Sequence, residues 1–144
     1  IWLDIARGDD ELRAGLRGKW RNRLNVAEKA GFAIEWDWRG QHMPALLQRY
    51  EDHKAAKGYR GPPARLLRAL ARRFVPRRKM LTGVASLGGV PAGMVLFFLH
   101  GGGATYQTGW ASDEGKKNSA HNILLWQACG LLREAGIRDL DLGG

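Results

Sequence analysis

Cysteine pairs, clustered metal ligands and long apolar runs are all missing from this sequence. Cys129 is the only cysteine among 144 residues, so no disulfide framework can form within the chain, which suits a reducing compartment. The four histidines, at positions 42, 53, 100 and 121, lack the spacing of metal ligands. No apolar stretch reaches the roughly 18 residues that cross a bilayer. We therefore expect a cytoplasmic protein without a metal site.

Acidic residues are scarce, and the shortage lies in the first half of the chain. Residues 1–79 carry 19 Lys and Arg against 9 Asp and Glu, whereas residues 80–144 carry 4 against 5. A basic surface of this kind attracts RNA, nucleotide phosphates or the anionic inner face of a membrane. An Arg-rich surface that is merely solvated would look the same. Both interpretations stay open.

The hydrophobic pattern of the first half predicts helices packed beside two short strands. Residues 2–5 and 32–36 read as strands. Leu12, Leu16, Trp20, Leu24 and Ala27 recur at helical spacing and predict one amphipathic helix over 11–31. The cationic side of that helix can hold phosphates or simply face solvent. Two further helices are expected, one opening at Pro44 and ending at Lys57, the other opening at Pro63 with Leu66, Leu67, Leu70, Ala71 and Phe74 inward.

The second half changes to strand periodicity. Residues 80–87 and 90–100 are apolar runs separated by Gly88-Gly89, a two-residue hairpin turn. A third strand over 104–110, a polar loop, a helix over 120–135 capped by Ser119 and a strand over 137–142 follow. A strand, a helix and a strand in this order favour a right-handed crossover and a parallel pair. The prediction is an α/β domain with a mixed sheet: helices, an antiparallel meander, then a crossover helix and parallel strand. This is the order of the GNAT-type acyltransferase fold, although pattern alone leaves other α/β folds open.

Three segments resemble the FemABX-like aminoacyltransferases, which are built from paired GNAT-like domains. They are KWRNRLNVAEKAG, GVPAGMVLFFLHGGGATYQTGWAS and AHNILLWQACGLLREAGIRDLDLGG. The resemblance covers nearly the whole chain and is strongest after Met80. It implies that residues 1–144 are one GNAT-like domain, the second of a longer two-domain protein and truncated at its C-terminus. It also implies transfer of an aminoacyl group from aminoacyl-tRNA to an amine of a peptidoglycan precursor.

The resemblance further implies where substrate binds. A channel for the precursor would be bordered by Lys57, Tyr59 and Arg60 after the second helix, and by Tyr106 on the meander. The lysine that stabilises the oxyanion in the family would lie beyond Gly144. Acetyl-CoA-dependent GNAT proteins hold pyrophosphate in a Gly-rich loop at a helix N-terminus, but here that place reads SDEGKKNSAHN, with a single glycine. We therefore expect no bound cofactor, and an acyl-CoA donor fits less well than aminoacyl-tRNA.

Four other residues carry candidate chemistry. His121, in the first turn of the last helix, can exchange a proton during amine attack, or can cap or pack as a polar residue. Asn122 can hold substrate or backbone, and Trp110 can border a channel or fill the core. Asp141 lies near the end of a parallel strand, where α/β sheets place site residues, or is a strand-end acceptor.

The leading hypothesis is a FemABX-like enzyme of peptidoglycan synthesis, acting in cell-wall biogenesis and cell shape. Its partners would be a nucleotide- or lipid-linked muropeptide, tRNA, the rest of the same protein and the inner membrane face. One alternative keeps the fold and uses acyl-CoA or an acyl carrier protein on a sugar or lipid amine. Another is a non-catalytic module that binds RNA or a membrane surface.

Overall fold

A six-stranded mixed sheet forms the centre of the domain. The structure is a computed structural model and describes residues 1–58 and 60–143. The strand order is β1-β6-β5-β4-β3-β2, and every neighbouring pair is antiparallel except β5 and β6. The strands are β1 (Trp2–Asp4), β2 (Ala33–Asp37), β3 (Met80–Leu87), β4 (Val90–His100), β5 (Gly103–Ala111) and β6 (Asp139–Asp141). The predicted α/β architecture, with a meander and one parallel pair, is confirmed.

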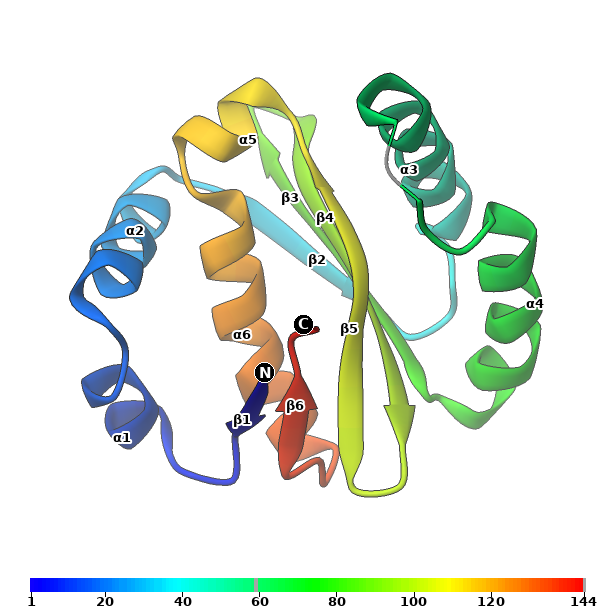
Figure 1. The fold of residues 1–144 in the computed structure, drawn as a ribbon. Coiled ribbons are helices and arrows are strands. Elements are labelled where there is room, and N and C mark those ends of the chain that lie inside the picture. Colours follow the sequence, from blue (N-terminus) through cyan, green and yellow to red (C-terminus); the bar gives the residue numbers. More distant parts are fainter. Residues whose placement is uncertain (59, 144) are drawn as a thin grey trace.

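Helices cover both faces of the sheet (Figure 1). One face carries α1 (Asp9–Ala14), α2 (Gly18–Lys29) and α6 (Ala120–Glu134), and the other carries α3 (Met43–Lys57), α4 (Ala64–Phe74) and the short 3-10 turn η1 (Val75–Arg77). A short helix, α5 (Asp113–Lys117), follows the end of β5. Each face has its own core: Phe97, Leu124 and Leu132 are buried on the α6 face, and Leu46, Leu67 and Leu96 on the α3–α4 face.

The helix predicted over 11–31 is two helices, α1 and α2, with a break after Ala14. Gly15 caps α1, and its N–H donates to the carbonyls of Glu11 and Leu12. Glycine weakens a helix by about 1 kcal/mol relative to alanine, and a second one, Gly18, opens α2. The two halves of the apolar stripe also pack in different places, since Leu12 joins the main core and Leu24 packs with Ile123. Tertiary packing thus divides a stripe that is continuous in the sequence.

Other boundaries differ in detail. The polar loop predicted before the last helix is largely α5, and the side chain that caps a helix there is that of Ser112, whose Oγ accepts from the Gly115 N–H at 3.1 Å. Ser119 precedes α6 in a left-handed conformation, with φ of 61°, and makes no side-chain cap. Leu66, predicted to face inward, is 47% exposed. The inward stripe of α4 runs instead through the remaining predicted positions, because Leu67, Leu70, Ala71 and Phe74 keep the spacing of one helix face.

Gly115 provides a test of how α5 is placed. A Cβ built on Gly115 would overlap the carbonyl oxygen of Ala92 in β4. Because that oxygen belongs to the backbone, the overlap can be relieved only if the whole of α5 shifts. We expect Gly115→Ala to lower the free energy of unfolding by about 1–3 kcal/mol, as overpacking does elsewhere. The measurement is urea unfolding. Gly130→Ala is the matched control, because a Cβ on Gly130 in α6 meets nothing within 4 Å, and it should be neutral or stabilising; equal losses in both variants would contradict the packing of α5.

Candidate functional site

The parallel strands β5 and β6 pair over a short length and then separate, which leaves a fork between them. Pairing between β5 and β6 covers only three positions, from Gly103 opposite Asp139 to Thr105 opposite Asp141. Beyond Thr105, β5 continues to Ala111 with no strand beside it on that side among the described residues. Figure 1 shows β6 ending well short of the upper end of β5, with α6 between that end and α2.

A β-bulge divides β5 into two halves that face opposite ways. Leu96 pairs with Thr108 and Phe97 pairs with Tyr106, so Gln107 is an extra residue in the strand. In a regular strand Tyr106 and Trp110 would share a face, but the bulge reverses the alternation between them. Tyr106 packs edge-on against Phe97, with ring centroids 5.7 Å apart, on the α6 face. Trp110 joins the opposite core, where the Arg49 guanidinium lies 4.7 Å from its ring centroid.

His121 meets the second half of β5 beside Tyr106. Its Nε2 lies 3.2 Å from the carbonyl oxygen of Trp110; since a carbonyl only accepts, Nε2 carries the proton in this hydrogen bond. A Cβ built on Gly109 would overlap the Tyr106 hydroxyl and come within 3.0 Å of His121 Nε2. These three residues therefore share one small space. Gly109 was not among the predicted site residues, although a glycine inside a strand often marks such a close approach.

Burial keeps His121 neutral. Desolvation lowers the pKa of its imidazole below the ordinary 6.5, outweighing the raising effect of the carbonyls of Trp110 and Met94, and the charge of Lys116 lowers it further. At neutral pH the ring is therefore unprotonated at Nδ1 when Nε2 donates to Trp110. A neutral imidazole with an available lone pair has the form that a general base requires.

This lowered pKa has a consequence for stability. The unfolded chain binds a proton on His121 more readily than the folded chain, so the free energy of unfolding falls as the pH drops below about 6.5. We expect His121→Gln to make that decline between neutral and acidic pH shallower than in the wild-type protein. Urea unfolding at a series of pH values measures both slopes. Identical slopes would contradict a lowered pKa.

A basic pocket adjoins His121 between α2 and α6. Its volume is about 330 Å³, and three of its lining residues are cations: Arg17, Lys19 and Arg23. In the described part of the chain none of the three forms an ion pair, whereas neighbouring Arg13 is held by Glu28 at 2.6 Å. The remaining lining residues are Trp20, His121, Asn122 and Leu125. The pocket can therefore receive an anionic group close to His121.

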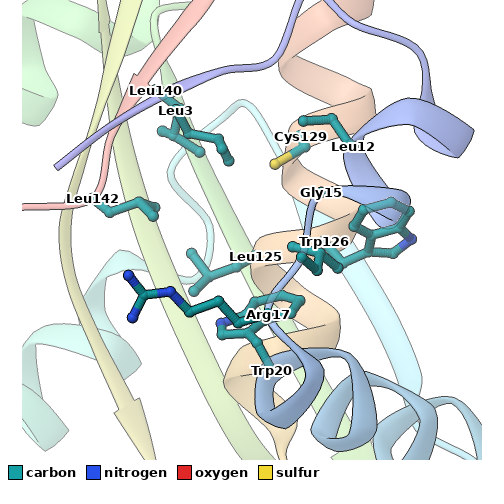
Figure 2. A pocket seen from close by; sticks show the side chains of 11 residues that line it. Leu3, Leu12, Gly15, Arg17, Trp20, Leu125, Trp126, Cys129, Leu140 and Leu142 are labelled. Carbon is teal, nitrogen blue, oxygen red and sulfur yellow. The ribbon is translucent and has the colours of Figure 1, made fainter.

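An apolar pocket of about 240 Å³ continues from the basic one (Figure 2). The two share Arg17, Trp20 and Leu125. Figure 2 shows Arg17 extended on the side of Leu142, away from Trp126. Its lining residues come from β1, from α1 and α2 and the segment that joins them, from α6, and from β6 and the residue that follows it. They are Leu3, Leu12, Gly15, Leu16, Arg17, Trp20, Leu125, Trp126, Cys129, Leu140 and Leu142. Because the sequence pattern predicted an unbroken helix here, it offered no sign of this pocket.

The structure brings together only some of the predicted site residues. His121 and Asn122 line the basic pocket, and Tyr106 lies beside His121. Asp141 lies at the base of the fork, where its Oδ1 accepts from the Gly143 N–H at 2.9 Å and closes a turn. Lys57 is the last residue of α3 and Arg60 follows that helix; both are exposed, and α3 lies on the face of the sheet away from α6 (Figure 1). Tyr59, predicted with them, lies outside the described residues.

Comparison with known proteins identifies the family. The profile of the acetyltransferase (GNAT) domain family matches residues 11–144. The chain belongs to this family. The FemABX-like resemblance of the sequence is confirmed by this match together with a crystal structure of FemX, which superposes with a TM-score of 0.86 at 13% identity over 99% of this chain and 52% of that one. The domain is therefore a FemABX-like acyltransferase domain.

A second solved structure has the same fold. It is the C-terminal domain of a protein from Agrobacterium fabrum named as a candidate lysylphosphatidylglycerol synthetase, with a TM-score of 0.67 at 19% identity over 99% of this chain and 44% of that one. The chain thus spans about half the length of the solved proteins it matches. No curated protein matches its sequence significantly. Among the described helices, none is both long and apolar enough to cross a membrane.

Proposed function

We propose that the domain transfers an aminoacyl group from aminoacyl-tRNA to an amine of a peptidoglycan precursor. The observation that carries this choice of donor is α5, which stands where CoA-dependent members of the fold hold pyrophosphate. Its first turn contains Asp113 and Glu114, whose charges repel phosphate from the helix N-terminus. Its Gly115 N–H is already bonded to Ser112 Oγ. A donor that needs no pyrophosphate cradle fits this place better than acyl-CoA.

The chemistry follows from the residues around Gly109. Aminolysis of an ester needs a neutral amine, stabilisation of the oxyanion and accurate approach. The Tyr106 hydroxyl donates to the carbonyl oxygen as it gains charge, together with any group supplied from outside the chain. The amine nitrogen forms a bond to the carbonyl carbon, His121 Nδ1 takes the proton that this nitrogen loses, and the ester C–O bond breaks. The proton then passes to the departing ribose oxygen.

The charges of the domain suit an RNA donor. Arg17, Lys19 and Arg23 form the rim of the basic pocket and bind the phosphates nearest the acyl ester. A second basic surface covers α4, where Arg65, Arg68, Arg72 and Arg73 are exposed, and no acidic residue occurs between Asp52 and Asp113. That surface contacts more distant phosphates of the tRNA or the anionic inner face of the membrane that carries a lipid-linked acceptor. We place the enzyme in the cytoplasm, at that face, with this chain as the second of two domains.

The test is a transfer assay with the full-length protein. Labelled aminoacyl-tRNA and a lipid-linked or nucleotide-linked muropeptide are incubated with the enzyme, and parallel reactions replace the tRNA by acyl-CoA. We expect label on the muropeptide amine only with the charged tRNA. Consumption of acyl-CoA without transfer from tRNA would contradict the choice of donor. Salt-sensitive RNA binding without transfer from either donor would instead favour a non-catalytic module.

The basic rim leads to a quantitative prediction for the same assay. Removing one cation that binds a phosphate reduces the salt slope of RNA binding by about 1, so the double variant Arg17→Ala and Arg23→Ala should lower that slope by about 2 and raise the KM for charged tRNA. Lys57→Ala with Arg60→Ala is the matched control, since α3, which ends at Lys57, lies on the other face of the sheet (Figure 1), and this double variant should leave the donor KM unchanged. Equal effects of the two double variants on the donor KM would contradict the assignment of the rim.

A further inference from the structure

We infer that the aminoacyl group handled by this domain has a large apolar side chain, and that the apolar pocket of Figure 2 holds it. This rests on the proposed aminoacyl transfer and adds the class of amino acid. The pocket has one charged lining residue, Arg17, beside leucines, two tryptophans and Cys129. Such a lining stabilises hydrocarbon and offers little to a small polar side chain.

The size of the pocket agrees with a side chain of the bulk of leucine or phenylalanine. A pocket of about 240 Å³ has room for a branched aliphatic group or an aromatic ring. The side chain of glycine, alanine or serine would leave most of that space unfilled, and unfilled apolar space forfeits dispersion contacts. One methylene group in an apolar pocket changes selectivity by roughly 10–200-fold. The difference between phenylalanine and alanine is therefore large enough to decide the donor.

The position of the pocket links it to the reacting centre. Leu125, which lines both pockets, follows His121 by four residues on α6, so the two lie about 6 Å apart along the helix axis. An acyl carbonyl beside His121 thus leaves its side chain one helical turn from the apolar lining. Arg17 lies where the pockets join and faces the phosphate of the terminal nucleotide, and Asn122 supplies a polar group at the rim for the α-amine. The acyl carbonyl, the amino-acid side chain and the phosphate of the terminal nucleotide then each lie beside protein groups of matching chemistry.

Binding and transfer together test the inference with the full-length protein. Non-hydrolysable 3′-aminoacylamido adenosines that carry phenylalanyl, leucyl, alanyl, glycyl or octanoyl groups are titrated calorimetrically, and tRNAs charged with the same four amino acids are compared in the transfer assay. We expect phenylalanyl or leucyl to exceed glycyl and alanyl at least tenfold in affinity and in kcat/KM. Equal or better binding of the small groups would overturn the inference, and tightest binding of octanoyl would assign the pocket to fatty acyl chains.

The two proposals fail in different ways. If transfer occurs but favours glycine or alanine, the proposed function stands and the side-chain pocket is wrong. If no charged tRNA reacts, the proposed function is wrong, and the analogue titration alone decides whether the pocket takes large apolar groups. A filling variant locates the effect: Leu125→Phe should lower the phenylalanyl-to-glycyl ratio at least tenfold. Leu131→Phe is its control, since Leu131 is partly buried on the same helix but lines neither pocket, and it should leave the ratio unchanged.

Discussion

Replacing His121 by glutamine is expected to lower kcat for acyl transfer by roughly 10²–10⁴-fold, the usual contribution of a general base. Glutamine can still donate to the Trp110 carbonyl, which His121 Nε2 contacts at 3.2 Å, but it cannot accept a proton from the attacking amine. The KM for either substrate should change little, because the missing interaction develops only as the amine attacks. Single-turnover transfer with saturating substrates measures the rate.

A second histidine provides the control for this experiment. His100, at the end of β4, bonds through Nε2 to Thr105 Oγ1 at 2.7 Å and lines neither of the two pockets beside α2 and α6. His100→Gln should keep the wild-type rate within a factor of a few. A His121→Gln protein that is folded and transfers at the same rate as His100→Gln would remove His121 from the chemistry and return it to a packing role.

Adding one methyl group at Gly109 should disable the site and destabilise the fold together. The Cβ of Gly109→Ala would overlap the Tyr106 hydroxyl and lie 2.9 Å from the Met94 carbonyl oxygen. We expect the free energy of unfolding to fall by about 1–3 kcal/mol and transfer to be abolished, because Tyr106 must leave the position from which it donates to the oxyanion. Urea unfolding and single-turnover rates measure the two effects.

Tyr106→Phe turns this prediction into a double-mutant cycle. The Tyr106 hydroxyl is the group that the new methyl group meets first. Once it is removed, Gly109→Ala should lower the free energy of unfolding by less than it does in the wild-type background. Coupling between residues in contact amounts to about 0.5–3 kcal/mol. Stability should recover in the double variant while transfer stays low. Strictly additive losses would show that Gly109 and Tyr106 do not share the space from which the site is built.

The strands and hairpins were predictable because their signals are local. Gly88-Gly89 and the apolar runs on either side of it fix a two-residue turn and two paired strands, whatever the rest of the chain does. The break after Ala14 was not predictable from periodicity, since Leu12 and Leu16 fit the stripe that continues into α2. Packing of Leu12 into the main core, apart from Leu24, separates the two helices, together with the two glycines of the break, Gly15 and Gly18.

The sequence named some residues of the candidate site but not their arrangement. His121 and Asn122 were singled out from their place at the start of a helix, and the structure puts both in one pocket. The relation between Tyr106 and Trp110 was not foreseen, because the extra residue Gln107 reverses the faces of β5. Gly109 was not predicted because it contributes by lacking a side chain, which leaves space for the Tyr106 hydroxyl and His121 Nε2. That space can be identified only once the positions of Tyr106 and His121 are known.

A crystal structure of the full-length protein with 3′-phenylalanylamido-3′-deoxyadenosine would test the site itself. We predict that the amide carbonyl oxygen lies within hydrogen-bond distance of the Tyr106 hydroxyl, the adjacent nitrogen on the side of His121, and the ring between Trp126 and Leu125. An analogue bound instead on the opposite face of the sheet, beside Trp110, Lys57 and Arg60, would contradict this placement of the reacting centre.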